Sequence, residues 1–371
     1  MFFLLYVAIT IYLWFRTIAP LPWQRWEKLL SILIVAIFSQ QYAINKVVFG
    51  TMFSPEFPRP MVIATNAAFG SVLLLLVFQL ALDMGLLACA AIKRKRIHAA
   101  AKLRYAIMIA AAALSCYGVS QAIVIPKVKE INIAIANLPD AFDGYRIIQL
   151  TDLHISKLFQ RPWVEQVVKD TNALNADAIV ITGDLIDGTL QARENDIAPL
   201  ADLQAPDGVY VIPGNHEYYF GYPQWIQKFQ DMNMVDLSNK HITLTKEQEQ
   251  LVIAGVVDNT SKRMGLEEPD LTKALKDSPT GAPIILLDHK PAAAKDAAQA
   301  GVALQLSGHT HGGMIRGFDI IVARFNSGFV SGLYPVDDMQ LYVNNGTALW
   351  LGFAIRLGVP PELTVITLRK K

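Results

Sequence analysis

The chain has 371 residues, of which 53% are hydrophobic and only 18% charged, and its formal net charge is +1 at pH 7. A soluble domain has about 25% charged residues, so this chain is poor in charge, and its near-neutral balance argues against a nucleic-acid partner. The two cysteines, Cys89 and Cys116, lie in the N-terminal third, which excludes disulfides and thiolate zinc sites from the remainder.

Four apolar, charge-free segments occupy the first 125 residues. They run from Met1 to Phe15, Leu29 to Asn45, Met61 to Leu82 and Tyr105 to Ile125. A membrane-spanning helix needs about 20 mostly apolar residues, so the last two segments are long enough, the second is marginal and the first is short. The first lacks the features of a cleaved signal peptide. We therefore predict a membrane domain over residues 1–126 with about four transmembrane helices, rather than a soluble helical core.

Basic residues between these segments predict the orientation of the chain. The cluster KRKR, Lys93 to Arg96, lies between the third and fourth segments, whereas the loop before the third has only Lys46 and Arg59. Positively charged loops stay in the cytoplasm, so four spans would place the rest of the chain outside it, on a bacterial inner or cell membrane. KRKR also fits a nucleic-acid patch, but its position beside a span favours membrane anchoring. Asp83 fits either a helix end at the membrane interface, which we favour, or a functional carboxylate within the membrane.

Residues 127–371 read as a separate globular domain in which strands alternate with helices, which predicts an α/β layered fold. The expected strands lie within INIAIANL, RIIQLTD, DAIVITGDLIDG, GVYVIPGNHEYY, APIILLDHKP and VALQLSGHTHGG, and the expected helices within WVEQVVKDTNAL, PQWIQKFQDM and PAAAKDAAQA.

Polar side chains follow five of these strands. They are Asp152 and His154; Asp184 and Asp187; Asn215 and His216; His289; and His309 and His311. In layered α/β sheets, sites form at the carboxyl ends of strands, so the five clusters are expected to converge. In an extended segment, the one-residue gap between His309 and His311 points both rings the same way. The remaining two histidines, His98 and His241, read as ordinary residues.

This donor set predicts a centre of two divalent metal ions. Imidazoles, carboxylates and one amide, without thiolate, suit Mn, Fe or Zn, and the donors are too many for one tetrahedral ion. Metal pairs about 3.5–4 Å apart serve phosphoester hydrolysis. Neither a GxxxxGK[ST] loop nor a GxSxG elbow is present.

Ordinary structural roles compete for several of these residues. Asp152 and Asp184 could cap helices, and Asn215 could serve only as a turn residue. His289 could be a buried core histidine, and Asp187, before Gly188, a solvated turn residue.

The motifs DLH, GDLID, GNHE, the strand-end His289 and GHTH, in this order, resemble the calcineurin-like metallophosphoesterase superfamily. The resemblance covers roughly Asn132 to Leu368. The flanking TDLHIS, PGNHEYY, GHTHGG and RLGVPPELTVITL resemble a bacterial branch that often carries N-terminal membrane helices. The resemblance implies a four-layer sandwich of two β-sheets flanked by helices.

The same resemblance implies a role for each site residue. One metal would be held by Asp152, His154 and His311, and the other by Asn215, His289 and His309, with Asp184 bridging both. A metal-bridging hydroxide would attack phosphorus. His216 would protonate or stabilise the leaving group, and Asp187 would orient His216.

The expected function is that of an integral-membrane hydrolase of phosphoric esters, with a phosphodiester as the favoured substrate. After GDLID the chain has Gly188 and Thr189 instead of the arginine and glycine of the protein phosphatases, which favours a small-molecule, lipid-linked or envelope phosphoester, with membrane lipids as neighbours. A related activity on lipid precursors at the cytoplasmic face would need the opposite topology. The alternatives are a metal-binding membrane sensor or scaffold without turnover and, less favoured, a transporter with a regulatory domain.

Overall fold

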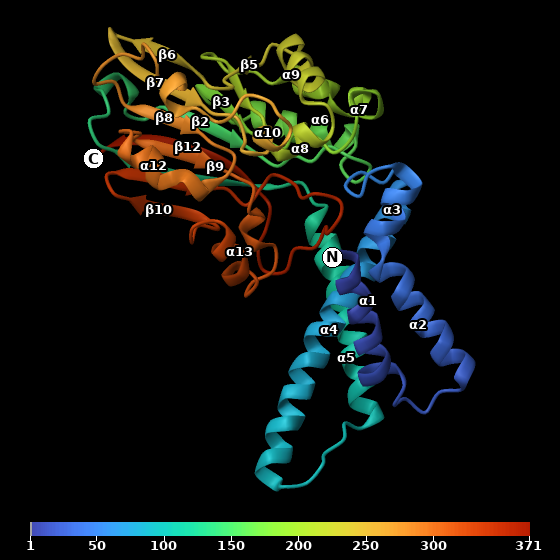
Figure 1. Cartoon of the computed structure of the whole chain (residues 1–371). Helices are drawn as coiled ribbons and strands as arrows, with labels where there is room; N and C mark the ends of the chain where they lie inside the picture. The colour runs from blue at the N-terminus through green and yellow to red at the C-terminus, as the bar shows by residue number, and fades with distance from the viewer. Residues whose placement is uncertain (1) are drawn as a thin grey trace. The chain divides into compact units, whose positions relative to one another are not determined.

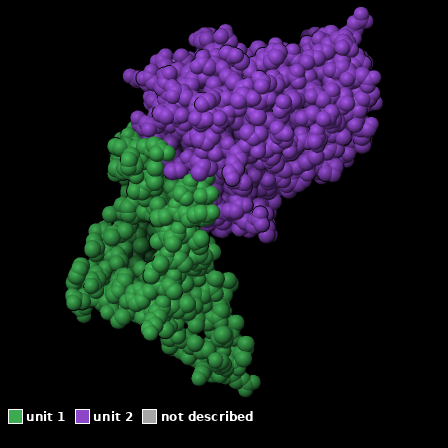
Figure 2. Space-filling view, turned by 180° about the vertical axis from the view of Figure 1, so that it is seen from behind, with its two compact units in different colours: residues 1–121, 351–355 green, residues 122–350, 356–371 purple. Residues whose placement is uncertain are grey.

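A computed structural model describes residues 2–371 and divides them into two compact units (Figure 2). The helical unit comprises residues 2–121 together with Leu351–Ile355. The α/β unit comprises Ala122–Trp350 and Arg356–Lys371. Five residues from the C-terminal part of the sequence thus belong to the unit built by its N-terminal part.

The helical unit contains α1 (Phe2–Leu13), which continues as a π-helical turn over Trp14–Ile18, then α2 (Arg25–Ser39), α3 (Gln41–Phe49), α4 (Arg59–Lys93) and α5 (Ala101–Ala122). Helices α4 and α5 are long and apolar enough to cross a membrane, and α2 with α3, bent by 60°, would make a third span. The helix from Phe3 to Ile18 is apolar but shorter. The structure thus has two or three candidate spans, and the presence of four transmembrane helices remains a prediction.

Asp83, on α4, has polar partners within the helical unit. Its carboxylate accepts hydrogen bonds from Arg16 Nε (2.7 Å), Tyr12 Oη (2.7 Å) and Gln79 Nε2 (2.8 Å). A carboxylate in an apolar unit is stable only when its charge is paired and its oxygens are hydrogen-bonded, and these contacts meet both conditions. This side chain therefore has a structural role in joining α1 to α4.

The segment Leu351–Ile355 is held by side chains of α3 and α4. Asn66 donates to the Leu351 carbonyl (2.8 Å) and accepts from the Ala354 N–H (2.8 Å), as a strand partner would. Gln41 and Tyr42 both donate to the Gly352 carbonyl at 3.0 Å. Because the segment has no sheet neighbours, these side chains satisfy its buried backbone groups.

The α/β unit contains two six-stranded mixed sheets (Figure 1). The first has the order β1-β12-β2-β3-β4-β5, formed by Lys127–Ile135, Glu362–Lys370, Arg146–Leu150, Ala178–Thr182, Val209–Ile212 and Val235–Asp236. The second has the order β10-β11-β9-β8-β7-β6, formed by Gly332–Val336, Met339–Val343, Leu304–Ser307, Ile284–Leu287, Glu249–Gly255 and Lys240–Lys246. Within each sheet the central pairs β2-β3-β4 and β7-β8-β9 are parallel, so their carboxyl ends share one edge.

The α-helices of this unit connect its strands, and some of them pack on the outer faces of the sheets. They are α6 (Arg161–Asn172), α7 (Leu190–Ile197), α8 (Asn215–Tyr219), α9 (Tyr222–Asp231), α10 (Thr260–Arg263), α11 (Leu271–Ala274), α12 (Ala294–Gln299) and α13 (Asp319–Phe325). The main core lies between the sheets, where Ile147 and Val180 pack with Ile285 and Leu306. A second core joins α12 to the outer face of the second sheet. The predicted four-layer sandwich is confirmed.

Candidate metal centre

The polar clusters predicted at the strand ends do converge. They follow β2, β3, β4, β8 and β9, and their donor atoms gather into three groups within 4.8 Å. The groups are Asp152, His154 and His311; Asp184, His289 and His309; and His154, Asp184 and His216. Asp184 and His154 each occur in two groups, so the three form one continuous cluster.

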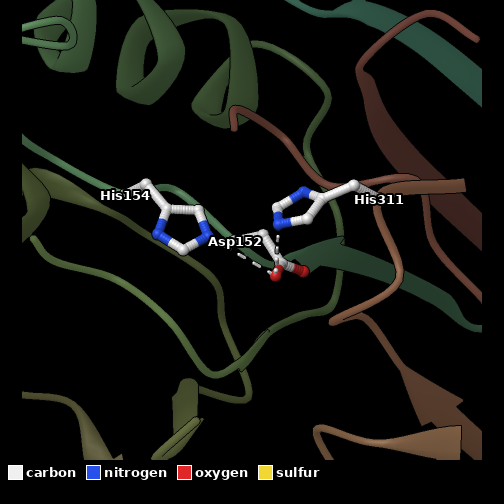
Figure 3. A group of neighbouring side chains, drawn as sticks. All are labelled: Asp152, His154 and His311. Carbon is white, nitrogen blue, oxygen red and sulfur yellow. Dashed lines mark ion pairs between the residues drawn. The ribbon is translucent and has the colours of Figure 1, made fainter. Parts of the chain in front are cut away.

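The first group combines residues from the ends of β2 and β9 (Figure 3). Asp152 Oδ1 lies 3.5 Å from His311 Nε2 and 3.7 Å from His154 Nε2. The other oxygen, Oδ2, accepts hydrogen bonds from Thr151 Oγ1 (2.8 Å) and from the His309 N–H (3.0 Å). The carboxylate is therefore fixed by one oxygen and presents the other to both imidazoles.

The second group is centred on Asp184, after β3. Its Oδ2 lies 3.2 Å from His289 Nε2 and 3.8 Å from His154 Nε2, so it faces both groups. His289 Nδ1 donates to the Thr182 carbonyl at 2.8 Å, which fixes the tautomer and leaves the Nε2 lone pair directed at the cluster. His289 is thus fully buried and yet aimed at the site, unlike an ordinary core histidine.

Buried atoms without partners show that this donor set fits cations. His154 Nε2, His289 Nε2 and Asn215 Oδ1 have no hydrogen-bond partner among the described residues. Such atoms are costly in a protein interior unless something else binds them. Imidazole nitrogens, carboxylates and an amide oxygen together are ligands that divalent ions accept. The residues present therefore match the predicted pair of metal ions.

The electrostatics of the cluster also favour positive charge at its centre. Burial by itself would raise the pKa of Asp152 and Asp184, but the surrounding imidazoles outweigh it and hold both pKa values below the usual range. Burial would lower the pKa of His289, but the Asp184 carboxylate outweighs it and raises that pKa to about 10. Burial lowers the pKa of His311 to about 3.

Asp187 contacts two histidines rather than the one that the sequence predicted. Its Oδ1 lies 2.5 Å from His216 Nδ1 and 3.2 Å from His154 Nδ1, and its side chain is fully buried. Each contact holds the Nδ1 proton and leaves Nε2 facing the cluster. Asp187 is therefore not a solvated turn residue, and it positions both rings.

The backbone at the cluster is unusual. Five of the seven predicted metal ligands have left-handed backbone angles, with φ of 52° at Asp152, 41° at His154, 55° at Asp184, 68° at His309 and 50° at His311. For residues other than glycine this conformation costs roughly 1–3 kcal/mol each and persists where the surroundings impose it, often at active sites. It also corrects the expectation of an extended segment: β9 ends at Ser307, and His309 and His311 reach separate groups through a turn.

Glycines allow the loops to approach this closely. A Cβ at Gly214 would lie 2.2 Å from Asp184 Oδ1, and one at Gly308 would lie 2.3 Å from Asp152 Oδ2. Any side chain at either position would displace a carboxylate of the cluster.

Two supporting residues were not singled out by the sequence. Glu217, fully buried, accepts hydrogen bonds from the N–H groups of Gly214 (2.7 Å), Asp184 (3.1 Å) and Leu185 (2.7 Å) and so ties two ligand loops together. Arg356, almost fully buried, donates to the carbonyls of Asn345 (2.7 Å) and Ala348 (2.7 Å) beside the cluster. The only sequence signal for either was its place inside the quoted motifs GNHE and RLGVPP.

Comparison with known proteins agrees with this geometry. A family model described as calcineurin-like phosphoesterase matches residues 145–313. The uncharacterized metallophosphoesterase YkuE of Bacillus subtilis is 33% identical over 240 residues, which cover 62% of this chain and 82% of YkuE. The chain belongs to the calcineurin-like metallophosphoesterases. Members of this family are phosphoester hydrolases that use a dinuclear centre of divalent metals.

Two other relatives cover a similar part of this metallophosphoesterase. A protein of Danio rerio named transmembrane protein with metallophosphoesterase domain is 34% identical over 274 residues, covering 71% of this chain and 62% of that protein. An uncharacterized metallophosphoesterase of Helicobacter pylori strain 26695 is 32% identical over 248 residues, covering 66% of this chain and 65% of that protein. The chain thus spans less than two thirds of both relatives. The first relative's name refers to a membrane, and two helices of this chain are long and apolar enough to cross one.

Proposed function

We propose that the chain is an integral-membrane, two-metal phosphoesterase that acts on a small-molecule, lipid-linked or envelope phosphoester, most readily a diester. The observation that supports it best is the set of unpaired buried donor atoms around Asp184 Oδ2. Asp152, His154 and His311 would hold one ion, Asn215, His289 and His309 the other, and Asp184 would bridge them. When bound, such a pair activates water as a nucleophile and neutralises the phosphoryl oxygens.

His216 is assigned to the leaving group rather than to a metal. Its Nδ1 is occupied by Asp187, and its Nε2 lies 4.0 Å from Asp184 Oδ2, at the margin of the cluster. A ring held in this way can carry a proton on Nε2 and deliver it to a departing alkoxide. His216 also belongs to the third donor group, which favours the competing assignment of His216 as a metal ligand. The metal content of a His216 variant distinguishes a proton donor from a metal ligand.

Hydrolysis by wild-type protein tests the function directly. Full-length protein in detergent with Mn²⁺ is expected to hydrolyse bis-p-nitrophenyl phosphate, and a chelator is expected to abolish the reaction until Mn²⁺, Fe²⁺ or Zn²⁺ is restored. Release of p-nitrophenol and the metal content of the protein as isolated are measured. A panel of lipid, nucleotide and glycan phosphoesters then identifies the substrate class. Turnover that persists in the chelator would contradict a metal-dependent reaction.

The distribution of basic residues supports an extracytoplasmic location for the α/β unit on a multi-pass membrane protein. Alkaline phosphatase fused after Lys371 is expected to be active in cells, and a green fluorescent protein fused there is expected to be dark. The reason is that positively charged loops stay in the cytoplasm, so KRKR would lie there and four spans would place Lys371 outside. The opposite pattern would refute this topology and favour a cytoplasmic substrate.

The alternative of a sensor or scaffold without turnover is less well supported. A protein that only binds metal has no use for a proton donor, yet His216 and its partner Asp187 are both present and in contact.

A further inference from the structure

A small cavity adjoins two of the proposed metal ligands, Asn215 and His309. Its volume is about 160 Å³, which is enough for a small anionic group. Tyr219, Arg263 and Lys290 also line it, and none of its lining residues is Asp or Glu. The cavity is therefore positively charged and open to the ligands of one metal.

Lys290 is held at this cavity by a buried carboxylate. Asp258 lies in the loop after β7 and is almost fully buried, and its Oδ1 accepts from Lys290 Nζ (2.8 Å) and from the Thr260 N–H (2.8 Å). The first contact fixes the ammonium group of the residue that follows His289. The second fixes the start of α10, the short helix that ends at Arg263.

Arg263 supplies charge that is not neutralised nearby. It is exposed and forms no ion pair with any residue that the structure describes. Its neighbour Lys262 differs, because Lys262 Nζ lies 2.9 Å from Glu268 and the side chain does not line the cavity. Of these two adjacent cations, only Arg263 lines the cavity and can contact a molecule bound beside the metal centre.

We propose that this cavity is a second anion site, which binds an anionic group that the substrate carries next to the scissile phosphate. A guanidinium group binds phosphoryl or carboxylate oxygens through paired hydrogen bonds, and a nearby ammonium adds a point charge. The inference rests on the proposed function, because it takes the metal pair as the place where the scissile phosphate binds. It narrows the substrate to phosphoesters with a second negative charge, such as a diphosphate or a carboxylate-bearing headgroup.

Calorimetric titration of Mn²⁺-loaded, full-length protein tests the site without relying on turnover. Inorganic phosphate and methylenediphosphonate are titrated into wild type, Arg263→Gln and the matched control Lys262→Gln. A hydrogen bond between charged groups contributes a factor of about ten or more to affinity. The ratio of the Kd for methylenediphosphonate to the Kd for phosphate is therefore expected to rise about tenfold or more in Arg263→Gln and to stay within about twofold in Lys262→Gln.

Two outcomes would overturn the second anion site. One is an unchanged ratio in Arg263→Gln, including the case in which both Kd values rise together through general electrostatic attraction. The other is an equal change in Lys262→Gln. Failure of wild type to hydrolyse any phosphoester would count against the proposed function instead, because the Kd ratio does not depend on hydrolysis.

Discussion

Asp184→Asn is expected to lose both metals and more than 100-fold in activity. The substitution keeps the shape of the side chain. Its Oδ1 can still accept the hydrogen bond that the His216 N–H donates to Asp184 Oδ1 in wild type (2.8 Å). It removes the negative charge and the acceptor Oδ2, which faces His289 Nε2 at 3.2 Å. Mutation of a residue that only orients a metal ligand lowers metal affinity or activity about 10–100-fold. Loss of a ligand that bridges both ions should therefore lower them further. Elemental analysis and hydrolysis of bis-p-nitrophenyl phosphate measure the two losses.

The matched control is Asp170→Asn, the same change at a partly buried residue of α6 whose carboxylate accepts from Gln166 one turn earlier (2.7 Å), and it should keep both metals and full activity. Thermal unfolding supplies a second readout, since a ligand that binds only the folded state raises Tm. Added Mn²⁺ should raise the Tm of wild type and of Asp170→Asn but not that of Asp184→Asn. An Asp184→Asn protein with two tightly bound ions would contradict the bridging role.

His216→Ala is expected to retain both metals while losing about 10²–10⁴-fold in rate on an unactivated alkyl phosphodiester, the usual scale of general acid–base catalysis. The reason is that the leaving alkoxide has a high pKa and departs slowly without a proton. On bis-p-nitrophenyl phosphate, whose leaving group needs little protonation, the loss should be much smaller. The contrast between the two substrates, measured as kcat, distinguishes proton donation from damage to the site.

His241→Ala is the control for this variant, because His241 lies partly buried on β6, outside the cluster, where its Nδ1 donates to the Ala274 carbonyl (2.7 Å). It should match wild type on both substrates. Loss of metal from His216→Ala would instead identify His216 as a ligand, in line with the third donor group. Full activity on the alkyl ester would exclude it as the proton donor.

The sequence predicted the parts of the fold that rest on local pattern. The strands β2, β3, β4, β8 and β9 are short apolar runs ended by polar residues, and parallel pairing then brings their ends together. The hairpins β6–β7 and β10–β11 were not anticipated. The strand β6 was missed although Ile242 and Leu244 alternate with polar residues along it, which is the period-two pattern of a half-buried strand.

The second contact of Asp187 and the role of Glu217 depend on distances between loops that are remote in sequence. Asp187 reaches His154 across 33 residues, and Glu217 reaches Leu185 across 32. Spacing along the chain can show that a carboxylate follows a strand, but not which neighbours its second oxygen will meet. The left-handed angles of the ligands are equally hidden, since aspartate and histidine adopt such angles more often than most residues but still only uncommonly.

The segment Leu351–Ile355 connects the C-terminal part of the sequence to the N-terminal helices. A truncated fragment starting near residue 127 would carry this pentapeptide without Asn66, Gln41 and Tyr42, leaving the Ala354 N–H and the Gly352 carbonyl without their present partners and uncovering Leu351 and Ile355. Deleting the N-terminal helices therefore also removes the hydrogen-bond partners of this segment. A water-soluble version would need this stretch redesigned as well as the helices deleted.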